Sequence, residues 1–523
     1  MSDNIQTKTH KRIGLYRLKF IPLFAIIFIY DFILLYSAPV ISYILPDIGT
    51  PGMNTYIEIL APNNANGNFG PDGLYTNNTD SQIKIEFVNP LDSQKVIFGP
   101  LVVSWNGRLI STQVFVNQNL SPNSWYWQVL SSKMKIPFRI NVSGNLSNVD
   151  TFYIVQPFQF GNKGGNAERI IGEGSLGTRS RRGAMIVDSM ILGNGIYKVS
   201  TIDCDPTTPG NQGYLPFVLL SKGKILSRDA TSISISGTNR NGGPGGGGGG
   251  GNFCDASFIN PGLIGDDGGD GFTGGGPGGK NCSGCSNAYK NTGTGTGAGG
   301  SSINGVRPSS PEWYESSGGG TGHPFGSSGI GCGDGNNCNP EGGNGGGSGC
   351  TQNKEGGSGG YGTSGGSFNS VGGGKIHGNE MGVPLAGGSG GASGNPNSPH
   401  ECSGSGGGGG GAISIFSWLN ITNIDITSQG VQGGRSGFGN GGDGSGGFIS
   451  TMAKVNVRDM TLDVSSAGAK GGTGRIRHDY PNPLGALVTD LPSSVHVVDG
   501  LTTDTSTWIR RKHLLTGSRK DQA

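Results

Sequence analysis

Apolar and polar residues alternate in four short segments of the C-terminal third of the chain, and the segments form two similar copies. The first copy comprises 412–415 and 424–427, and the second comprises 448–451 and 462–465. Glycine-rich loops follow at Gly430 and at Gly468. The offset between the copies is 36 residues at the first segment (412 to 448) and 38 at the second (424 to 462). Alternation with a period of two predicts β-strands with one apolar face.

Neither copy contains enough apolar surface to fold alone. Stacking one copy on the next would join the two apolar faces into a continuous column, as in solenoid proteins. The sequence therefore predicts an all-β protein in which 166–480 is a right-handed parallel β-helix-like domain. Strand-like segments such as Ala184–Val187 and Ser232–Ile235 are interpreted as its first, irregular coils.

The glycine-rich copies resemble those of a known class of surface protein. The resemblance rests on a Gly-Gly-x-Ile-x-Ile strand, an Ile-x-Ile-x-Ser-x-Gly strand, a poly-glycine loop and the closing Gly474-Arg475-Ile476. It covers about 411–476, with a further match at 233–237. This region is similar to the coils of glycine-rich parallel β-helix proteins, such as bacterial surface and autotransporter-like proteins. The resemblance implies a secreted or surface-attached protein, with adhesion or cell-envelope structure as its role.

Composition narrows the class of protein further. Of 523 residues, 104 are glycine, 33% are hydrophobic and 14% are charged, without a Gly-x-y period. The missing period excludes collagen, and glycine so far above the usual ~7% excludes an enzyme of ordinary globular composition throughout. The formal net charge of +2 gives no reason to expect nucleic acid as a partner. The glycine clusters precede no helix signal, so they predict no phosphate-binding loop. No cofactor and no metal site are predicted.

The N-terminal 45 residues have the pattern of an export segment. A basic stretch, 1–19, precedes the apolar run 20–45, which contains Asp31. About 25 apolar residues can cross a bilayer as a helix, and the basic flank places the N-terminus in the cytoplasm. Two alternatives stay open: an uncleaved transmembrane signal anchor, which must bury Asp31, or a signal peptide cut near Ala38 at a poor site. The rest of the chain is then either membrane-anchored at the cell surface or secreted.

Residues 51–165 are predicted to form a β-sandwich-like domain, because seven short alternating segments are separated by turn signals. The segments are Tyr56–Leu60, Ile83–Val88, Lys95–Phe98, Leu101–Trp105, Gln113–Val116, Phe138–Val142 and Thr151–Val155. A stretch rich in Asn and Asp between Asn63 and Asp80 offers oxygen ligands for Ca²⁺, although turn formation explains the same residues.

Two tryptophans in this domain form a candidate binding surface. Trp125 and Trp127 flank Tyr126, so the two indoles share one face in an extended strand. They would serve either as a stacking platform for an extracellular glycan or as core filling between the sheets.

The glycine-rich segment 238–411 separates the strand at Ile233 from the strand at Ala412. The equivalent loop of the later copy, Gly430–Gly447, is about ten times shorter, so 238–411 is interpreted as one enlarged loop. A structureless insertion of this length is uncommon, so it is either flexible or ordered by itself. If ordered, it is similar to the glycine-rich domains of some phage tip adhesins and animal receptors, in which poly-glycine packs as hydrogen-bonded polyproline-II helices.

Eight cysteines are predicted to form disulfide bonds, because the number is even and little apolar surface surrounds them in an exported chain. They are Cys204, Cys254, Cys282, Cys285, Cys332, Cys338, Cys350 and Cys402. Their connectivity stays open. Cys282-Ser283-Gly284-Cys285 has the spacing of half a zinc site or of a redox pair. A zinc site would need a second Cys-x-x-Cys and a redox pair a flanking βαβ pattern, and the sequence contains neither.

These features predict a non-catalytic exported protein with a structural or adhesion role at the cell surface. Its expected partners are the membrane, through the N-terminal helix, and an extracellular glycan or a neighbouring surface. The alternative is a glycan-binding or carbohydrate-active β-helix protein acting on extracellular polysaccharide. Such an enzyme needs paired acids on neighbouring coils, and Asp425 and Asp463 are the candidate pair. In the tail, 481–523, Val495–Val498 is expected to form one of the last strands.

Overall fold

The computed structural model describes most of the strand-forming chain and part of the glycine-rich insertion. The described residues are 38–62, 68–120, 134–155, 157–161, 169–172, 180–181, 183–200, 215–227, 231–251, 318–325, 345–346, 355–368, 371–379, 381–394, 403–436, 439–479, 495–497 and 501–502. Strands and extended loops make up almost all of these ranges, so the all-β prediction is confirmed. Within them, the only helical segment is the short 3-10 helix η1 (Pro90–Gln94).

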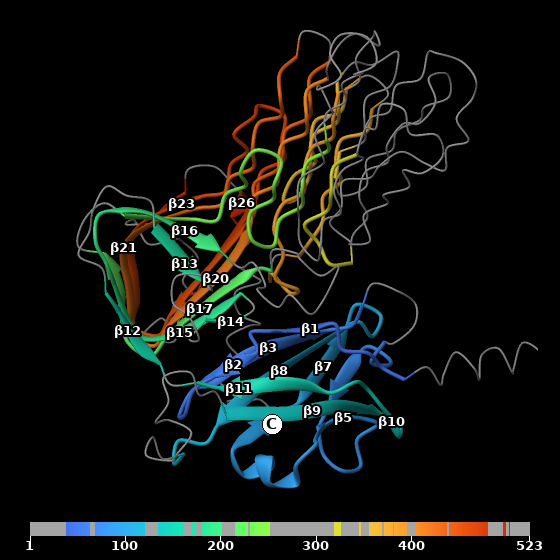
Figure 1. Ribbon diagram of the computed structural model, residues 1–523, viewed down its shortest axis with the longest axis vertical. Helices are drawn as coiled ribbons and strands as arrows, with labels where there is room; N and C mark the ends of the chain where they lie inside the picture. The colour runs from blue at the N-terminus through green and yellow to red at the C-terminus, as the bar shows by residue number, and fades with distance from the viewer. Residues whose placement is uncertain are drawn as a thin grey trace, which may run out of the picture.

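The N-terminal part of the chain folds into two facing sheets (Figure 1). The first has the order β1-β3-β8-β7-β4 with β6 beside β8, and the second has the order β10-β9-β11-β2 with β5 beside β9. The strands are β1 (Tyr43–Leu45), β2 (Ile48–Gly49), β3 (Asn54–Leu60), β4 (Gly73–Tyr75), β5 (Ile83–Phe87), β6 (Val96–Phe98), β7 (Leu101–Ser104), β8 (Leu109–Val116), β9 (Met134–Val142), β10 (Asn145–Leu146) and β11 (Asp150–Ile154). Apolar residues from alternate strand positions, among them Ile57, Phe138 and Phe152, fill the space between the sheets.

Strand β1 corrects the predicted C-terminal end of the membrane span. Tyr43–Leu45 lie in the predicted apolar run 20–45, but they pair antiparallel with β3, with Ile44 opposite Ile59. Ile44 is fully buried in the core between the two sheets. These residues are apolar because they fill a protein core. The rest of the predicted span, 20–37, lies outside the described residues.

The second part of the chain is a stack of coils built on three parallel ladders. The first ladder runs β12-β15-β17-β20-β22-β24-β26, and the second runs β13-β16-β19-β21-β23-β25. The third joins the C-terminal part of β15 through β18 to the N-terminal parts of β21 and β23. The strands are β12 (Phe158–Gly161), β13 (Arg169–Gly172), β14 (Ser180–Arg181), β15 (Ala184–Leu192), β16 (Gly195–Ser200), β17 (Phe217–Ser221), β18 (Ile225–Ser227), β19 (Thr231–Ser234), β20 (Ala412–Ser417), β21 (Asn420–Thr427), β22 (Phe448–Ala453), β23 (Asn456–Asp463), β24 (Arg475–Asp479), β25 (Val495–Val497) and β26 (Leu501–Thr502). The inner positions carry the buried apolar column expected from the sequence, including Ile413, Ile426 and Ile449.

Paired residues of the two coils are 36 positions apart in the first two ladders (412 to 448 and 424 to 460), whereas the sequence predicted an offset of 38 for the second segment. Ala412 pairs with Phe448 as expected, but Ile424 pairs with Met460 and not with Leu462. Asn423 and Asp459 occupy equivalent places in β21 and β23, and both have positive φ, at 57° and 54°. This left-handed residue interrupts the alternation in each strand, because it turns the side chains on either side of it out of phase.

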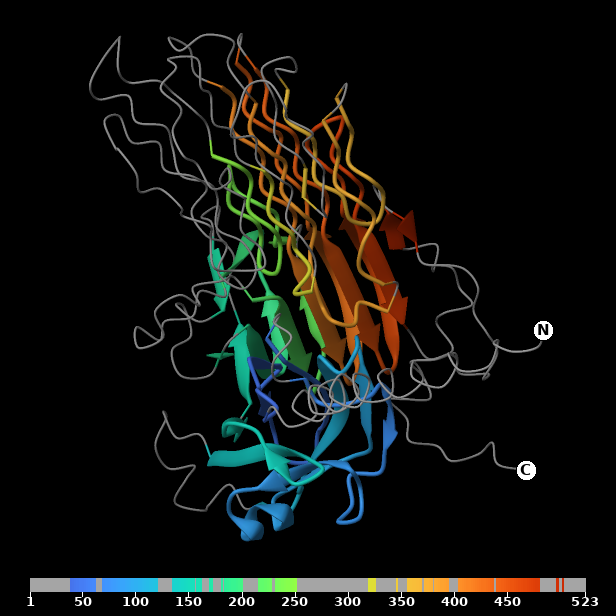
Figure 2. The same cartoon turned by 90° about the vertical axis from the view of Figure 1, so that its right-hand side faces the viewer.

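The glycine-rich insertion enters and leaves the stack between neighbouring strands. Phe217 of β17 pairs directly with Ile413 of β20, although residues 238–411 lie between them in the sequence. Beyond the strand ends, extended segments of the insertion run side by side with the glycine loops of the coils (Figures 1 and 2). Hydrogen bonds join segment to segment: Gly247 N donates to Gly388 O, Gly388 N to Gly410 O, and Gly410 N to Ser445 O, each at 2.8 Å.

The glycine segments form a lattice in which neighbouring backbones approach too closely for a side chain at most glycine positions, with a few short buried side chains such as Ser389 and Ser445 between them. At most of its glycines, an added Cβ would lie within 3.0 Å of a backbone atom of a neighbouring segment. Where it is described, the insertion is therefore ordered through hydrogen bonds between segments, the arrangement expected of packed polyproline-II helices. Close approach of backbones explains why the sequence uses glycine here.

The two-sheet domain and the coil stack share one apolar cluster. Leu45 and Leu60 of the two-sheet domain pack in this cluster with Val218 of the stack and with Tyr361 and Leu385 of the insertion. The outward face of the β17-β20-β22 ladder is thus buried partly against the N-terminal domain. Its remaining part borders a cleft.

Candidate functional site

A cleft lies where β3 of the two-sheet domain meets the outward face of β17, β20 and β22. It encloses about 80 Å³. The residues that line it are Leu45, Pro46, Asn54, Thr55, Tyr56, Glu58, Val218, Leu220, Gly382, Leu385, Ser414, Ile415, Phe416, Phe448, Ser450 and Met452. Strands from both units and a loop of the insertion form its walls, so the cleft exists only when all three are assembled.

Two serine hydroxyls lie side by side on the ladder wall of the cleft. Ser414 of β20 and Ser450 of β22 are register partners on adjacent parallel strands, which places their backbones about 4.8 Å apart. Both alternate with inward residues of the apolar column, so both side chains face outward to the cleft. Ser450 is only 2% exposed, yet neither hydroxyl hydrogen-bonds to any described residue. Two adjacent hydroxyls, one on the half-buried Ser414 and one on the buried Ser450, are thus available for a ligand.

A buried carboxylate lies on the opposite wall. Glu58 of β3 is 4% exposed, and its Oε2 accepts a hydrogen bond from Leu385 N at 3.0 Å. Burial, together with the negative charge of Glu58, raises the pKa of the neighbouring Tyr43 phenol well above its ordinary value. None of the described lining residues is Lys, Arg or His. The nearest cation on the ladder is Arg477 of β24, the register partner of Ser450, and its Nη1 already donates to Met381 O at 3.4 Å.

An aromatic and apolar surface extends from the serine pair along the same ladder. Phe416 and Met452 are the next outward residues of β20 and β22, and they too are register partners. Trp418 stands edge-on to Phe416, with ring centroids 4.7 Å apart. Lys454 Nζ lies 4.2 Å from the centroid of Trp418. The cleft therefore offers an aromatic side chain beside the two hydroxyls.

A second cluster of chemically distinctive residues joins the turn after β7 to the glycine-rich insertion. The Trp105 and His323 rings lie 4.7 Å apart, His323 and His377 lie 6.0 Å apart, and His377 and Tyr361 lie 4.9 Å apart, all between centroids. Trp105 Nε1 also donates to Val383 O at 3.4 Å. This aromatic–histidine cluster holds the insertion against the two-sheet domain.

Both histidines of the cluster are held in the neutral form. Burial lowers the pKa of His323 to about 3, and the nearby His377 adds to this effect. Burial also lowers the pKa of His377 to about 4, against the opposing effect of its hydrogen bond with Lys375 O. His323 Nδ1 accepts from Phe325 N at 3.2 Å, so its proton resides on Nε2, which has no hydrogen-bond partner among the described residues. The cluster is a packing site that resists protonation.

The residues predicted from the sequence as site residues fall outside the described ranges. These are the stacking candidates Trp125 and Trp127 and the cysteines Cys204, Cys254, Cys282, Cys285, Cys332, Cys338, Cys350 and Cys402. Stacking by the two tryptophans and the pairing of the cysteines stay predictions.

The candidate acid pair of a carbohydrate-active enzyme is not a pair. Asp425 is opposite Thr461, and Asp463 is opposite Thr427, so the predicted alignment of Asp425 with Asp463 is wrong by two residues. Asp425 Oδ1 accepts from Thr461 N at 3.1 Å. Asp463 is 8% exposed, and it accepts from Ser465 N at 2.9 Å and from the Gln429 amide. Both carboxylates stabilise the coils through hydrogen bonds.

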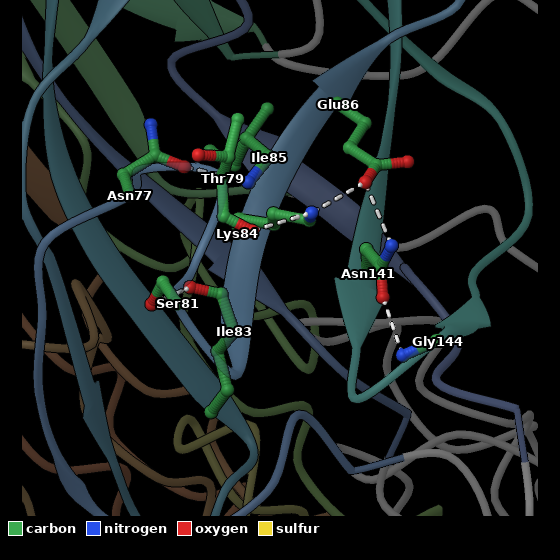
Figure 3. Close-up of polar contacts among 9 residues, drawn as sticks. All are labelled: Asn77, Thr79, Ser81, Ile83, Lys84, Ile85, Glu86, Asn141 and Gly144. Atoms are coloured by element: carbon green, nitrogen blue, oxygen red, sulfur yellow. Dashed lines mark hydrogen bonds and ion pairs between the residues drawn. The ribbon is translucent and has the colours of Figure 1, made fainter.

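The oxygens of the Asn- and Asp-rich stretch are also used within the fold. Asn77 Oδ1 accepts from Ile85 N at 2.7 Å (Figure 3), and Asn77 Nδ2 donates to Phe98 O at 3.1 Å. Asp72 accepts from the backbone N–H groups of Asn106 and Gly107, at 3.2 and 2.8 Å. Turn formation accounts for these two residues, and 63–67 lie outside the described ranges.

The described residues contain no candidate metal site and no candidate membrane-spanning helix. In the part of the chain that the structure describes, His, Cys, Asp and Glu side chains form no group of three or more suited to hold a metal ion. Among those same residues, no helix combines the length and the apolar character needed to span a membrane. The chain matches no protein-family model, no curated protein and no solved structure.

The sequence contained one signal for the cleft that the strand pattern obscured. In Ile413–Trp418 the inward positions carry the expected apolar residues, but the outward positions carry Ser414, Phe416 and Trp418. Aromatic residues on the solvent side of an alternating strand indicate a covered or ligand-binding face. The partner strand that covers this face, β3, lies more than 350 residues earlier in the sequence, so no local pattern could identify it.

Proposed function

We propose that this chain is a non-catalytic exported protein with a structural or adhesion role at the cell surface. In this proposal 20–37 supplies the export signal or membrane anchor. The two facing sheets are a β-sandwich, and the coil stack is a β-helix-like stalk. The glycine-rich lattice projects from the stack as a rigid lobe that makes contact with a neighbouring surface.

The glycine lattice is the observation that supports this proposal most directly. It consists mainly of backbone groups that hydrogen-bond to one another, and at most of its glycines the neighbouring segment lies too close for a side chain. Such a hydrogen-bonded network forms an extended, stiff body. The resemblance to glycine-rich surface proteins points in the same direction.

We expect the full-length chain, tagged at its C-terminus and expressed in cells with a secretory pathway, to be labelled on intact cells by a membrane-impermeant biotin reagent. Replacing Ile26 and Phe28 by arginine should abolish labelling, because each charge in the middle of a span costs about 3 kcal/mol on insertion scales. The control is Leu91→Arg, which adds a charge at a position that is 62% exposed. Labelling that survives the arginine pair, or a wild-type chain that stays in the cytosol, contradicts the proposal.

The cysteines provide an independent test of export. In an oxidising compartment we expect all eight to be paired, because disulfides stabilise segments with little apolar surface. Thiol titration of the exported, denatured chain should detect no free thiol before reduction. Peptide mapping without reduction would then give the connectivity. Free thiols at most of the eight positions would show that the chain matures in a reducing compartment.

A carbohydrate-active enzyme is the weaker alternative on the present geometry. The acids that were its candidates, Asp425 and Asp463, belong to different coil positions and accept hydrogen bonds from the backbone. The glycan-binding form of the alternative retains support from the cleft between the two domains.

A further inference from the structure

We propose that the cleft between β3 and the β20-β22 face is a binding site for a single neutral sugar ring. This inference rests on the proposed surface role, since it names the kind of molecule that the protein would contact. The cleft was not among the sites predicted from the sequence, and its residues come from three separate parts of the chain.

The polar groups of the cleft match a hydroxyl-rich ligand. Ser414 and Ser450 present two adjacent hydroxyls without partners, and each can donate and accept a hydrogen bond. Each can therefore form a net favourable hydrogen bond with a ligand hydroxyl. Glu58 faces them with carboxylate oxygens that accept hydrogen bonds from hydroxyl groups.

The apolar groups of the cleft match the C–H face of a sugar ring. Phe416 and Met452 lie next to the serine pair on the same two strands, so one ligand can contact all four side chains. Aromatic side chains pack favourably against such apolar faces. The volume of about 80 Å³ is the space open to the centre of a water-sized sphere. One water needs about 10–15 Å³ on this measure, so the cleft has room for roughly six waters, which is close to the size of one pyranose. A longer glycan would have to extend out of the cleft.

The charges of the cleft decide against two other ligand classes. An anionic ligand such as a phosphate or a sialic acid would meet the Glu58 carboxylate, with no Lys, Arg or His among the described lining residues. Arg477, beside Ser450 on β24, lies outside the lining and is bonded to Met381 O. An ammonium ligand would pair with Glu58 and with aromatic faces, but it would leave the two serine hydroxyls without a partner. A neutral ring with several hydroxyls uses all of these groups.

The test is saturation-transfer NMR of the full-length chain with the methyl glycosides of glucose, galactose, mannose and N-acetylglucosamine. We expect transfer to at least one of them, with a Kd of about 1 mM. In the Ser414→Ala/Ser450→Ala double variant the Kd should rise about tenfold or more, since two hydrogen bonds are lost. Neither serine bonds within the described protein, so thermal unfolding should be unchanged.

The matched control is Ser232→Ala, which removes a half-buried strand hydroxyl from β19, on the second ladder. It should bind like the wild type. The absence of transfer to every glycoside, equal transfer in the double variant, or binding of choline instead of sugars would overturn the proposal. None of these results would change the outcome of the biotin-labelling test. The proposal of sugar binding can therefore be wrong while the proposal of a surface location holds.

Discussion

The Gly446→Ala variant is expected to lose a large part of the stability of the coil stack. A Cβ at this position would lie within 3.0 Å of the Val464 carbonyl oxygen and carbon and of Gly474 N. These are backbone atoms at the edge of the ladder, where Gly446 N also donates to Gly472 O. Because no flexible side chain can move aside, we expect a loss of about 4 kcal/mol or more, measured as the free energy of unfolding in urea.

The matched control for this prediction is Gly73→Ala in β4. There the nearest atom to an added Cβ is Tyr75 Cε2 at 3.5 Å, an ordinary contact. This change should alter the unfolding free energy by less than about 1 kcal/mol. If Gly446→Ala were as stable as Gly73→Ala, the close packing of the glycine segments would be wrong.

The stack could be predicted from the sequence because its core is a local pattern. Every second residue of Ile413–Ile415 and of the later copy is apolar, and the structure buries these residues in one column. The register of the second ladder was missed because Asn423 and Asp459 adopt a left-handed conformation inside their strands. Asn and Asp are depleted in strands and adopt the left-handed conformation more readily than other non-glycine residues, so these two residues were a signal of the bend that the alternation of apolar and polar positions did not include.

The cleft and the aromatic–histidine cluster could not be predicted, because each joins residues that are distant in the sequence. Glu58 meets Leu385, and Trp105 meets His323, through contacts between a sandwich strand or turn and a loop of the insertion. Histidines scattered in glycine-rich loops are usually solvated. Only the three-dimensional arrangement shows that His323 is 2% exposed.

Acidification below pH 6.5 is expected to destabilise the contact between the insertion and the two-sheet domain. In the unfolded chain His323 and His377 bind protons with an ordinary pKa of about 6.5, whereas the folded protein lowers these pKa values to about 3 and about 4. Above pH 6.5 both states are neutral, so the stability is fully present there. As the pH falls, the unfolded state alone gains protons, and stability is lost until the folded pKa is reached.

The expected loss is about 1.4 kcal/mol per pH unit for each histidine, or about 2.7 kcal/mol for His323 alone at pH 4.5. The measurement is the urea unfolding free energy between pH 7 and pH 4.5.

His323→Asn keeps an acceptor for Phe325 N but removes the titrating ring, so the pH slope should become shallower even though the variant is less stable at pH 7. His513→Asn, near the C-terminal end of the chain, should keep the wild-type slope. An unchanged slope in His323→Asn would mean that this ring is accessible to protons in the folded state, because a histidine with an ordinary pKa in both states adds nothing to the pH dependence.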